Sequence, residues 1–107
     1  MILEIADIRI DPARIAEFDA AIAHGLATVV SQCAGYRWHR VVKGIESPGR
    51  YMLTIGWDTL EAHTETFRGG PLFPQWRAIV GPFFAQPPQV EHYTLVTETA
   101  ASAGYPL

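Results

Sequence analysis

Cysteine and lysine are almost absent from this chain of 107 residues. The single cysteine, Cys33, cannot form an intramolecular disulfide or a cysteine-rich metal site, which favours a reducing, cytoplasmic environment. The single lysine, Lys43, and the scattered arginines leave a formal net charge of −3. A protein that binds nucleic acid needs a clustered basic face, so we expect no nucleic-acid partner.

Long apolar runs are missing as well. None approaches the roughly 18 residues that span a bilayer. The chain opens on Met1, Ile2, Leu3 and Glu4, without the basic region and apolar core of a secretory signal peptide. We therefore expect a protein with no membrane partner.

The chain is short on charge but rich in apolar side chains. Charged residues make up 18% of it, below the roughly 25% of an average soluble domain, and apolar residues make up 49%. This balance indicates a globular protein with an additional buried surface, most simply a subunit interface. The length is that of one domain, which we place at residues 1–97, followed by a tail at 98–107.

Periodic apolar patterns predict six secondary-structure elements. Tyr51, Leu53, Ile55 and Trp57 alternate with smaller or more polar residues, as in a half-buried strand. Apolar residues at helical spacing follow Asp11-Pro12, a pair typical of a helix start. The predicted order is a strand at 2–10, a helix that starts at Asp11-Pro12 and ends near Cys33-Ala34-Gly35, strands at 36–43 and 51–57, a helix from 59, a short helix or turn-rich segment at 72–80, and a strand at 89–97.

This order, β-α-β-β-α-β, is the split pattern of ferredoxin-like α+β domains. Such a domain has a four-stranded antiparallel sheet with both helices on one face. The other face must be polar or meet a partner, and neither face of these strands is cleanly polar: Trp38 and Val42 alternate with His39 and Val41. We therefore predict a homodimer that packs sheet face against sheet face.

A wider set of residues carries a family resemblance. Its elements are the strand that ends at Trp57, the sequence Glu61-Ala62-His63, the aromatic residues Phe67, Phe73 and Trp76, and the closing Gly81-Pro82 and Pro87-Pro88. Together they resemble the antibiotic biosynthesis monooxygenase family of dimeric α/β barrels. The resemblance covers nearly the whole chain and implies the ferredoxin-like dimer.

One branch of that superfamily degrades haem with an Asn on the first strand, a Trp at the end of the third and a His ligand on the next helical segment. In this chain the Trp position holds Trp57, the first-strand position holds Asp7, and the ligand region holds Trp76 and Arg77. Because no His occupies the ligand position, the resemblance does not extend to haem binding.

The other branch oxidises aromatic polyketides without metal or flavin. In that chemistry the protein deprotonates a phenol in an apolar cavity, and the substrate carbanion reduces dioxygen. The resemblance implies His63 and Trp57 as catalytic residues and no cofactor. The implied substrate pocket holds Asp7, Tyr51, Phe67, Phe73, Trp76, Arg77, Phe83 and Phe84, with His92 and Arg68 as further polar candidates.

Two functions stay open at this point. The first is a cofactor-independent monooxygenase that acts on a small aromatic or quinol-like substrate, with His63 as the candidate base. The second is a non-catalytic dimeric module that binds a small apolar ligand or a partner. The four histidines, at positions 24, 39, 63 and 92, lack the spacing of a zinc or iron site, so we expect no metal.

Overall fold

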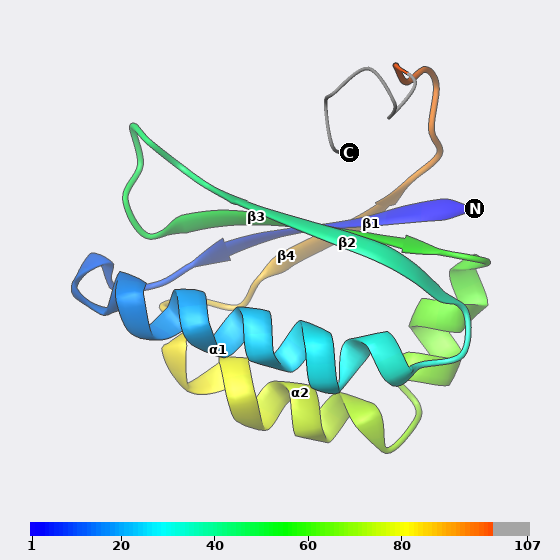
Figure 1. The fold of residues 1–107 in the computed structure, drawn as a ribbon, viewed down its shortest axis with the longest axis horizontal. Helices are drawn as coiled ribbons and strands as arrows, with labels where there is room; N and C mark the ends of the chain where they lie inside the picture. Colours follow the sequence, from blue (N-terminus) through cyan, green and yellow to red (C-terminus); the bar gives the residue numbers. More distant parts are fainter. Residues whose placement is uncertain (100–107) are drawn as a thin grey trace.

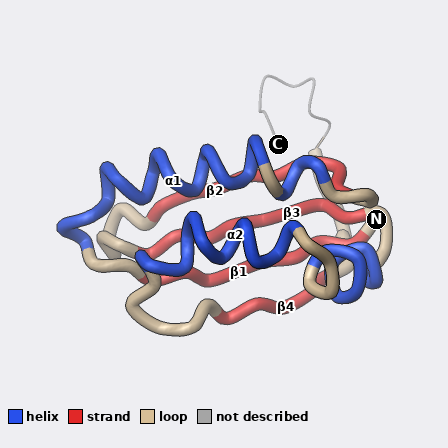
Figure 2. The backbone as a smooth tube through the Cα atoms, turned by 90° about the horizontal axis from the view of Figure 1, so that it is seen from below, coloured by secondary structure: helices blue, strands red, loops and turns tan. Residues whose placement is uncertain are grey.

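A computed structural model describes residues 1–99 of the chain. Its strands are β1 (Ile2–Arg9), β2 (Tyr36–Lys43), β3 (Arg50–Trp57) and β4 (Gln89–Tyr93). They form one antiparallel sheet in the order β2-β3-β1-β4. The helices α1 (Ile15–Thr28) and α2 (Leu72–Val80) both lie on one face of it (Figures 1 and 2). The predicted ferredoxin-like α+β fold is confirmed, and we call its two sides the covered face and the open face.

Strand β3 shows how alternation builds the core. Tyr51, Leu53, Ile55 and Trp57 each retain 2% exposure or less, because their side chains all point to the covered face. The neighbouring β1 contributes Ala6, Ile8 and Ile10 to the same core, as their alternation predicts. The covered face is therefore apolar along most of its length.

Helix α1 begins close to the predicted position and ends earlier than predicted. The carboxylate of Asp11 accepts from the backbone N–H of Ala13, and Pro12 opens the short 3-10 turn that leads into the helix. The α-helix ends at Thr28, and a second 3-10 turn follows at Val30–Gln32. Gly35 then turns the chain with φ of 92°, a conformation that favours glycine.

The two helices approach closely at a glycine of α1. A Cβ atom added at Gly25 would lie 3.0 Å from the ring of Trp76 in α2. The missing side chain therefore lets the indole of Trp76 pack directly against the backbone of α1. This contact fixes α2 over the sheet and places Trp76 beside the cavity described below.

The alternation predicted for β2 is wrong at its first residue. Tyr36 pairs with Trp57 whereas Trp38 pairs with Gly56, so Arg37 is an extra residue in a β-bulge. The bulge moves Tyr36 to the covered face, where its ring meets Trp57 edge-on at 6.3 Å. Trp38 and the alternate residues after it stay on the open face.

The helix predicted from residue 59 is a single π-helix, η3 (Ala62–Phe67). The hydroxyl of Thr59 accepts from the backbone N–H of Ala62 and closes its first turn. His63 and Phe67 are buried on the inner side of this turn, whereas Leu60 is 41% exposed. Residues 69–71 break the chain as predicted, and α2 has the predicted bounds.

Strand β4 is shorter than the predicted 89–97. Its last residue, Tyr93, pairs with Leu3 near the start of β1, so the neighbouring strand offers almost no further backbone for pairing. Residues 94–99 form no strand, and most of the predicted tail, residues 100–107, lies outside the described residues. No helix within residues 1–99 is long and apolar enough to cross a membrane.

Candidate active site

A cavity of about 280 Å³ lies between the sheet, η3 and α2. Aromatic and aliphatic side chains form most of its wall, and charged or ionisable groups occupy the remainder. The lining residues are Glu4, Ala6, Ile8, Leu53, His63, Phe67, Arg68, Phe73, Trp76, Arg77, Phe84, Pro87, Pro88 and Val90.

Two buried ionisable side chains of the wall, Glu4 and His63, contact each other and two further polar groups behind the wall. Trp57 Nε1–H donates to Glu4 Oε1 at 3.0 Å, and His63 Nε2 lies 3.3 Å from the same oxygen. His63 Nδ1 in turn lies 2.7 Å from Nε2 of His92. Glu4 and His63 are only 6% and 2% exposed, so these contacts are shielded from solvent.

Strand register explains why these side chains meet. Glu4 of β1 is paired with His92 of β4, so both side chains point to the covered face. Trp57 ends β3 on that face, and η3 lays the ring of His63 over the indole, with ring centroids 5.4 Å apart and planes inclined by 19°. The stacked Trp57 thus holds the imidazole against Glu4.

Burial determines the protonation states of Glu4, His63 and His92. Burial raises the pKa of Glu4, against the smaller opposing effects of the Trp57 hydrogen bond and the Arg68 charge. It lowers the pKa of His63 to about 3, and the charges of Arg68 and His92 lower it further. The pKa of His92 is also lowered, by burial first and then by Arg68. Both imidazoles are therefore neutral near pH 7.

A neutral imidazole has one N–H donor and one acceptor nitrogen, so the partners determine the tautomer. When Glu4 is ionised, a lone pair on His63 Nε2 would be repelled by Oε1 at 3.3 Å, so Nε2 carries the hydrogen. His63 Nδ1 then accepts from Nε2–H of His92. In this state both ring nitrogens of His63 are engaged.

Most of the predicted pocket residues lie together in the structure. His63, Phe67, Phe73, Trp76, Arg77 and Phe84 all line the 280 Å³ cavity. Trp57 does not line it, since it lies fully buried behind Glu4 and His63. Phe83 packs on Phe18 of α1 instead, at 5.4 Å between ring centroids.

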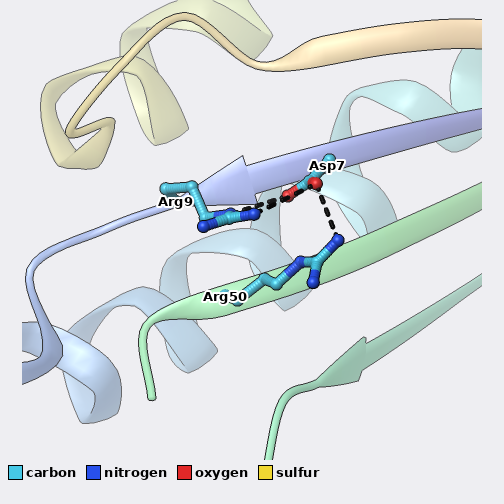
Figure 3. Close-up of polar contacts among 3 residues, drawn as sticks. All are labelled: Asp7, Arg9 and Arg50. Atoms are coloured by element: carbon cyan, nitrogen blue, oxygen red, sulfur yellow. Dashed lines mark hydrogen bonds and ion pairs between the residues drawn. The ribbon is translucent and has the colours of Figure 1, made fainter. Parts of the chain in front are cut away.

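Two other predicted pocket residues lie elsewhere. Tyr51 lines a second, more open cavity of about 480 Å³ between α1 and β2, where its hydroxyl donates to Asp19 at 2.5 Å. Asp7 lies on the open face, between Arg9 and Arg50 at 2.9 and 3.0 Å (Figure 3). The guanidinium of Arg9, with that of Arg50, holds the pKa of Asp7 below its usual value.

Glu4 is the site residue absent from the predicted set. Its position in β1 carries a signal, because the alternation that places Ile2, Ala6 and Ile8 on one face places Glu4 there too. A carboxylate at an inward position needs a partner or a function. Within residues 1–99, no group of three or more His, Cys, Asp or Glu side chains is arranged to hold a metal ion.

Comparison with known proteins identifies the family to which this chain is related. The profile of the antibiotic biosynthesis monooxygenase family matches residues 1–79. The uncharacterized protein YczJ of Bacillus subtilis is 36% identical over 93 residues, which cover 87% of this chain and 97% of YczJ. The chain is thus similar along nearly its whole length to a full-length relative.

Solved structures agree with this assignment. A Bordetella bronchiseptica structure described under the same family name is 38% identical, covers 90% of this chain and 97% of its own, and superposes with a TM-score of 0.84. A variant of SnoaB, a cofactor-independent oxygenase from Streptomyces nogalater, shares the fold at 14% identity and a TM-score of 0.74, over 92% of this chain and 96% of that one. The chain belongs to the antibiotic biosynthesis monooxygenase family.

Proposed function

We propose that this protein is a cofactor-independent monooxygenase that acts on a small aromatic or quinol-like substrate. One observation carries the proposal: an aromatic cavity whose wall includes two buried ionisable groups, Glu4 and His63, with His92 in contact with His63 behind it. Such a cavity excludes water from a bound ring and offers a group that can take its proton. The description of SnoaB, which shares the fold, supports the same class of reaction.

The proposed reaction needs only the substrate and dioxygen. Loss of the phenolic proton gives an anion whose charge spreads to a ring carbon, and this carbanion reduces dioxygen to a hydroperoxide. Loss of water then leaves a new carbonyl group on the ring. One oxygen atom enters the product and the other leaves as water, with every electron supplied by the substrate.

The protein contributes position and exclusion of water. Phe67, Phe73 and Trp76 offer faces on which a planar ring can stack. Arg68 and Arg77 also line the cavity, and neither makes an ion pair with another residue in the described range 1–99. Their charges favour the anionic form of a bound phenol over the neutral form.

We also propose that the protein works as a homodimer through the open face. That face carries half-exposed apolar side chains such as Ile5 of β1, and Val42 on β2 is 53% exposed. An apolar sheet face left in water favours association. Sedimentation at micromolar concentration that shows only the 11.8 kDa chain would refute the dimer. The single, buried Cys33 is consistent with a cytoplasmic protein.

Dioxygen uptake with a panel of hydroxynaphthoquinones and anthrones tests the reaction. We expect turnover by the wild type and a large loss in His63→Ala, which removes the stacked imidazole beside Glu4. His24→Ala is the matched control, because His24 lies exposed on α1 outside the cavity. Ligand binding without turnover in both wild type and His63→Ala would instead favour the alternative, a non-catalytic dimeric module that binds a small ligand or a partner.

A further inference from the structure

We infer that Glu4, rather than His63, is the group that accepts the substrate proton. The inference rests on the proposed function and names the base within it. Glu4, His63 and His92 differ in which of their lone pairs are free to accept a proton.

His63 has no free lone pair when Glu4 is ionised. Its Nε2 lies 3.3 Å from Glu4 Oε1, where a lone pair would be repelled by the carboxylate, so Nε2 carries the hydrogen, and its Nδ1 accepts from His92 at 2.7 Å. To take a proton from a substrate, His63 would have to break one of these bonds and carry a positive charge in a buried position. Burial and the charge of Arg68 both oppose that charge.

Glu4 has an oxygen to spare. Its Oε1 meets both Trp57 and His63, whereas its Oε2 makes no hydrogen bond with any residue in the range 1–99. Among residues 1–99, the one fully buried polar side-chain atom without a hydrogen-bond partner is Arg50 Nε. Since Glu4 Oε2 also lacks a partner but is not such an atom, it is not fully buried. Because Glu4 lines the cavity, this accessible oxygen is available to a ligand there.

The surroundings of Glu4 suit a base for a phenol. Trp57 faces it from β3, His63 from η3, His92 from β4, and Arg68 from the end of η3. Burial raises the pKa of the carboxyl toward that of a phenol, which strengthens it as a base. Trp57 and Arg68 oppose that rise and favour the ionised state that can accept a proton.

The proton transfer is simple to write. The acidic bond of the substrate breaks, O–H in a phenol or C–H in an anthrone, the proton moves to Glu4 Oε2, and the electron pair stays on the substrate and spreads over its oxygen and ring carbon. Addition of dioxygen to the carbanion gives a peroxide anion, which takes the proton back from Glu4, becomes the hydroperoxide and restores the carboxylate. The hydroperoxide then loses water, made from its own ring C–H hydrogen and its terminal O–H group. In this scheme His63 and His92 are positioning residues, because they act on the carboxylate and not on the substrate.

Anaerobic binding of dithranol, an anthrone whose anion absorbs at longer wavelength than its neutral form, tests proton transfer without oxidation. We expect the wild type to ionise bound dithranol and Glu4→Gln to bind it in the neutral form. The amide keeps an oxygen to accept from Trp57. In air, Glu4→Gln should lower kcat by about 100-fold or more, the contribution typical of a general base.

Glu91→Gln is the matched control, since Glu91 directly follows Val90 and pairs with Ile5, on the open face. It removes one carboxylate from the same sheet and should leave dithranol ionisation and kcat unchanged. Ionisation by Glu4→Gln equal to that by the wild type would overturn the inference. So would a wild type that binds dithranol without ionising it.

His63→Phe decides the roles of the two residues even if Glu4→Gln does not fold. Phenylalanine retains a ring over Trp57 but removes the N–H that stabilises the carboxylate. The pKa of Glu4 should rise, so the pH midpoint of dithranol ionisation should move upward, and His63→Gln, which restores a donor, should move it back. Complete loss of ionisation in His63→Phe would identify His63 as the base and overturn the inference.

The outcomes separate this inference from the proposed function. Turnover by the wild type with an unimpaired Glu4→Gln would overturn the role of Glu4 alone. Absence of wild-type turnover across the whole panel would overturn the proposed oxygenase. Anaerobic ionisation would still show whether Glu4 accepts the proton of a bound phenol.

Discussion

Two carboxylates on the same strand have opposite environments. Glu4 and Asp7 are three residues apart on β1, which places their side chains on opposite faces of the sheet. Glu4 lies on the covered face against His63 and Trp57, and burial raises its pKa. Asp7 lies on the open face between two guanidinium groups, which lower its pKa (Figure 3).

The difference shows that the basicity of an acidic side chain depends more on which face of the sheet it occupies than on whether it is Asp or Glu. On the covered face a carboxylate loses water and meets neutral donors, so it is a stronger base. On the open face Asp7 meets cations and keeps part of its hydration, so it is a weaker base. Only the first of these environments suits proton abstraction from a phenol.

The largest expected effect tests the two faces themselves. Ile8→Asp places a charge on the covered face, where Ile8 is 2% exposed. The cost of burying it, above about 4 kcal/mol, is comparable with the whole stability of a small domain, so we expect no folded protein. Ile5→Asp, on the open face, should fold with an unchanged circular dichroism spectrum.

The same pair tests the dimer. Ile5→Asp would place like charges in the proposed interface, so we expect it to sediment as a single 11.8 kDa species under conditions in which the wild type is dimeric. An Ile5→Asp protein that stays dimeric would show that the open face is not the interface. A folded Ile8→Asp protein would contradict the assignment of the two faces.

A smaller effect concerns the buried imidazole. The pKa of His63 is about 3 in the folded protein and near 6.5 in the unfolded chain, so the unfolded state binds more protons between these values. The free energy of unfolding should therefore fall as pH falls from about 6.5 toward 3, by at most about 1.4 kcal/mol per pH unit from this residue. Glu4 opposes part of this slope, because its raised pKa favours protonation of the folded state.

Urea unfolding at several pH values in a Glu4→Gln background isolates the histidine contribution. Adding His63→Phe to that background should flatten the slope between pH 6.5 and 3. Adding His24→Gln, on the exposed side of α1, should leave it unchanged. An unchanged slope in the His63→Phe protein would mean that folding does not lower the pKa of His63.

The sequence carried enough periodicity to predict the fold and the bounds of α2. The strand ending at Trp57 followed from the alternation of its apolar residues alone. Other features depend on pairing between distant segments. The bulge at Arg37 reverses the face of Tyr36, and a bulge is defined only by the register against a neighbouring strand.

The candidate site was only partly predictable, because it too depends on pairing between distant segments. Aromatic wall residues could be named from their types, since large rings after a strand end commonly border a cavity. Glu4 and His92 lie side by side only because β1 pairs with β4, which comes from the other end of the described chain. The π-helix was not predicted either, although it brings His63 over Trp57 and so completes the site.

The smallest expected effect is at Asp7. Its contacts with Arg9 and Arg50 lie on the open face of a single chain, where such ion pairs contribute about 1 kcal/mol or less. In the monomeric Ile5→Asp background, Asp7→Asn should therefore lower the free energy of unfolding by no more than that at pH 7 in low salt, and by less in 1 M salt. The pKa of Asp7 is lowered, so this contribution is present above about pH 3.8 and is lost as pH falls through the folded-state value. Urea unfolding at both salt concentrations measures it, and a loss of several kcal/mol would show that Asp7 belongs to a buried network like that of Glu4.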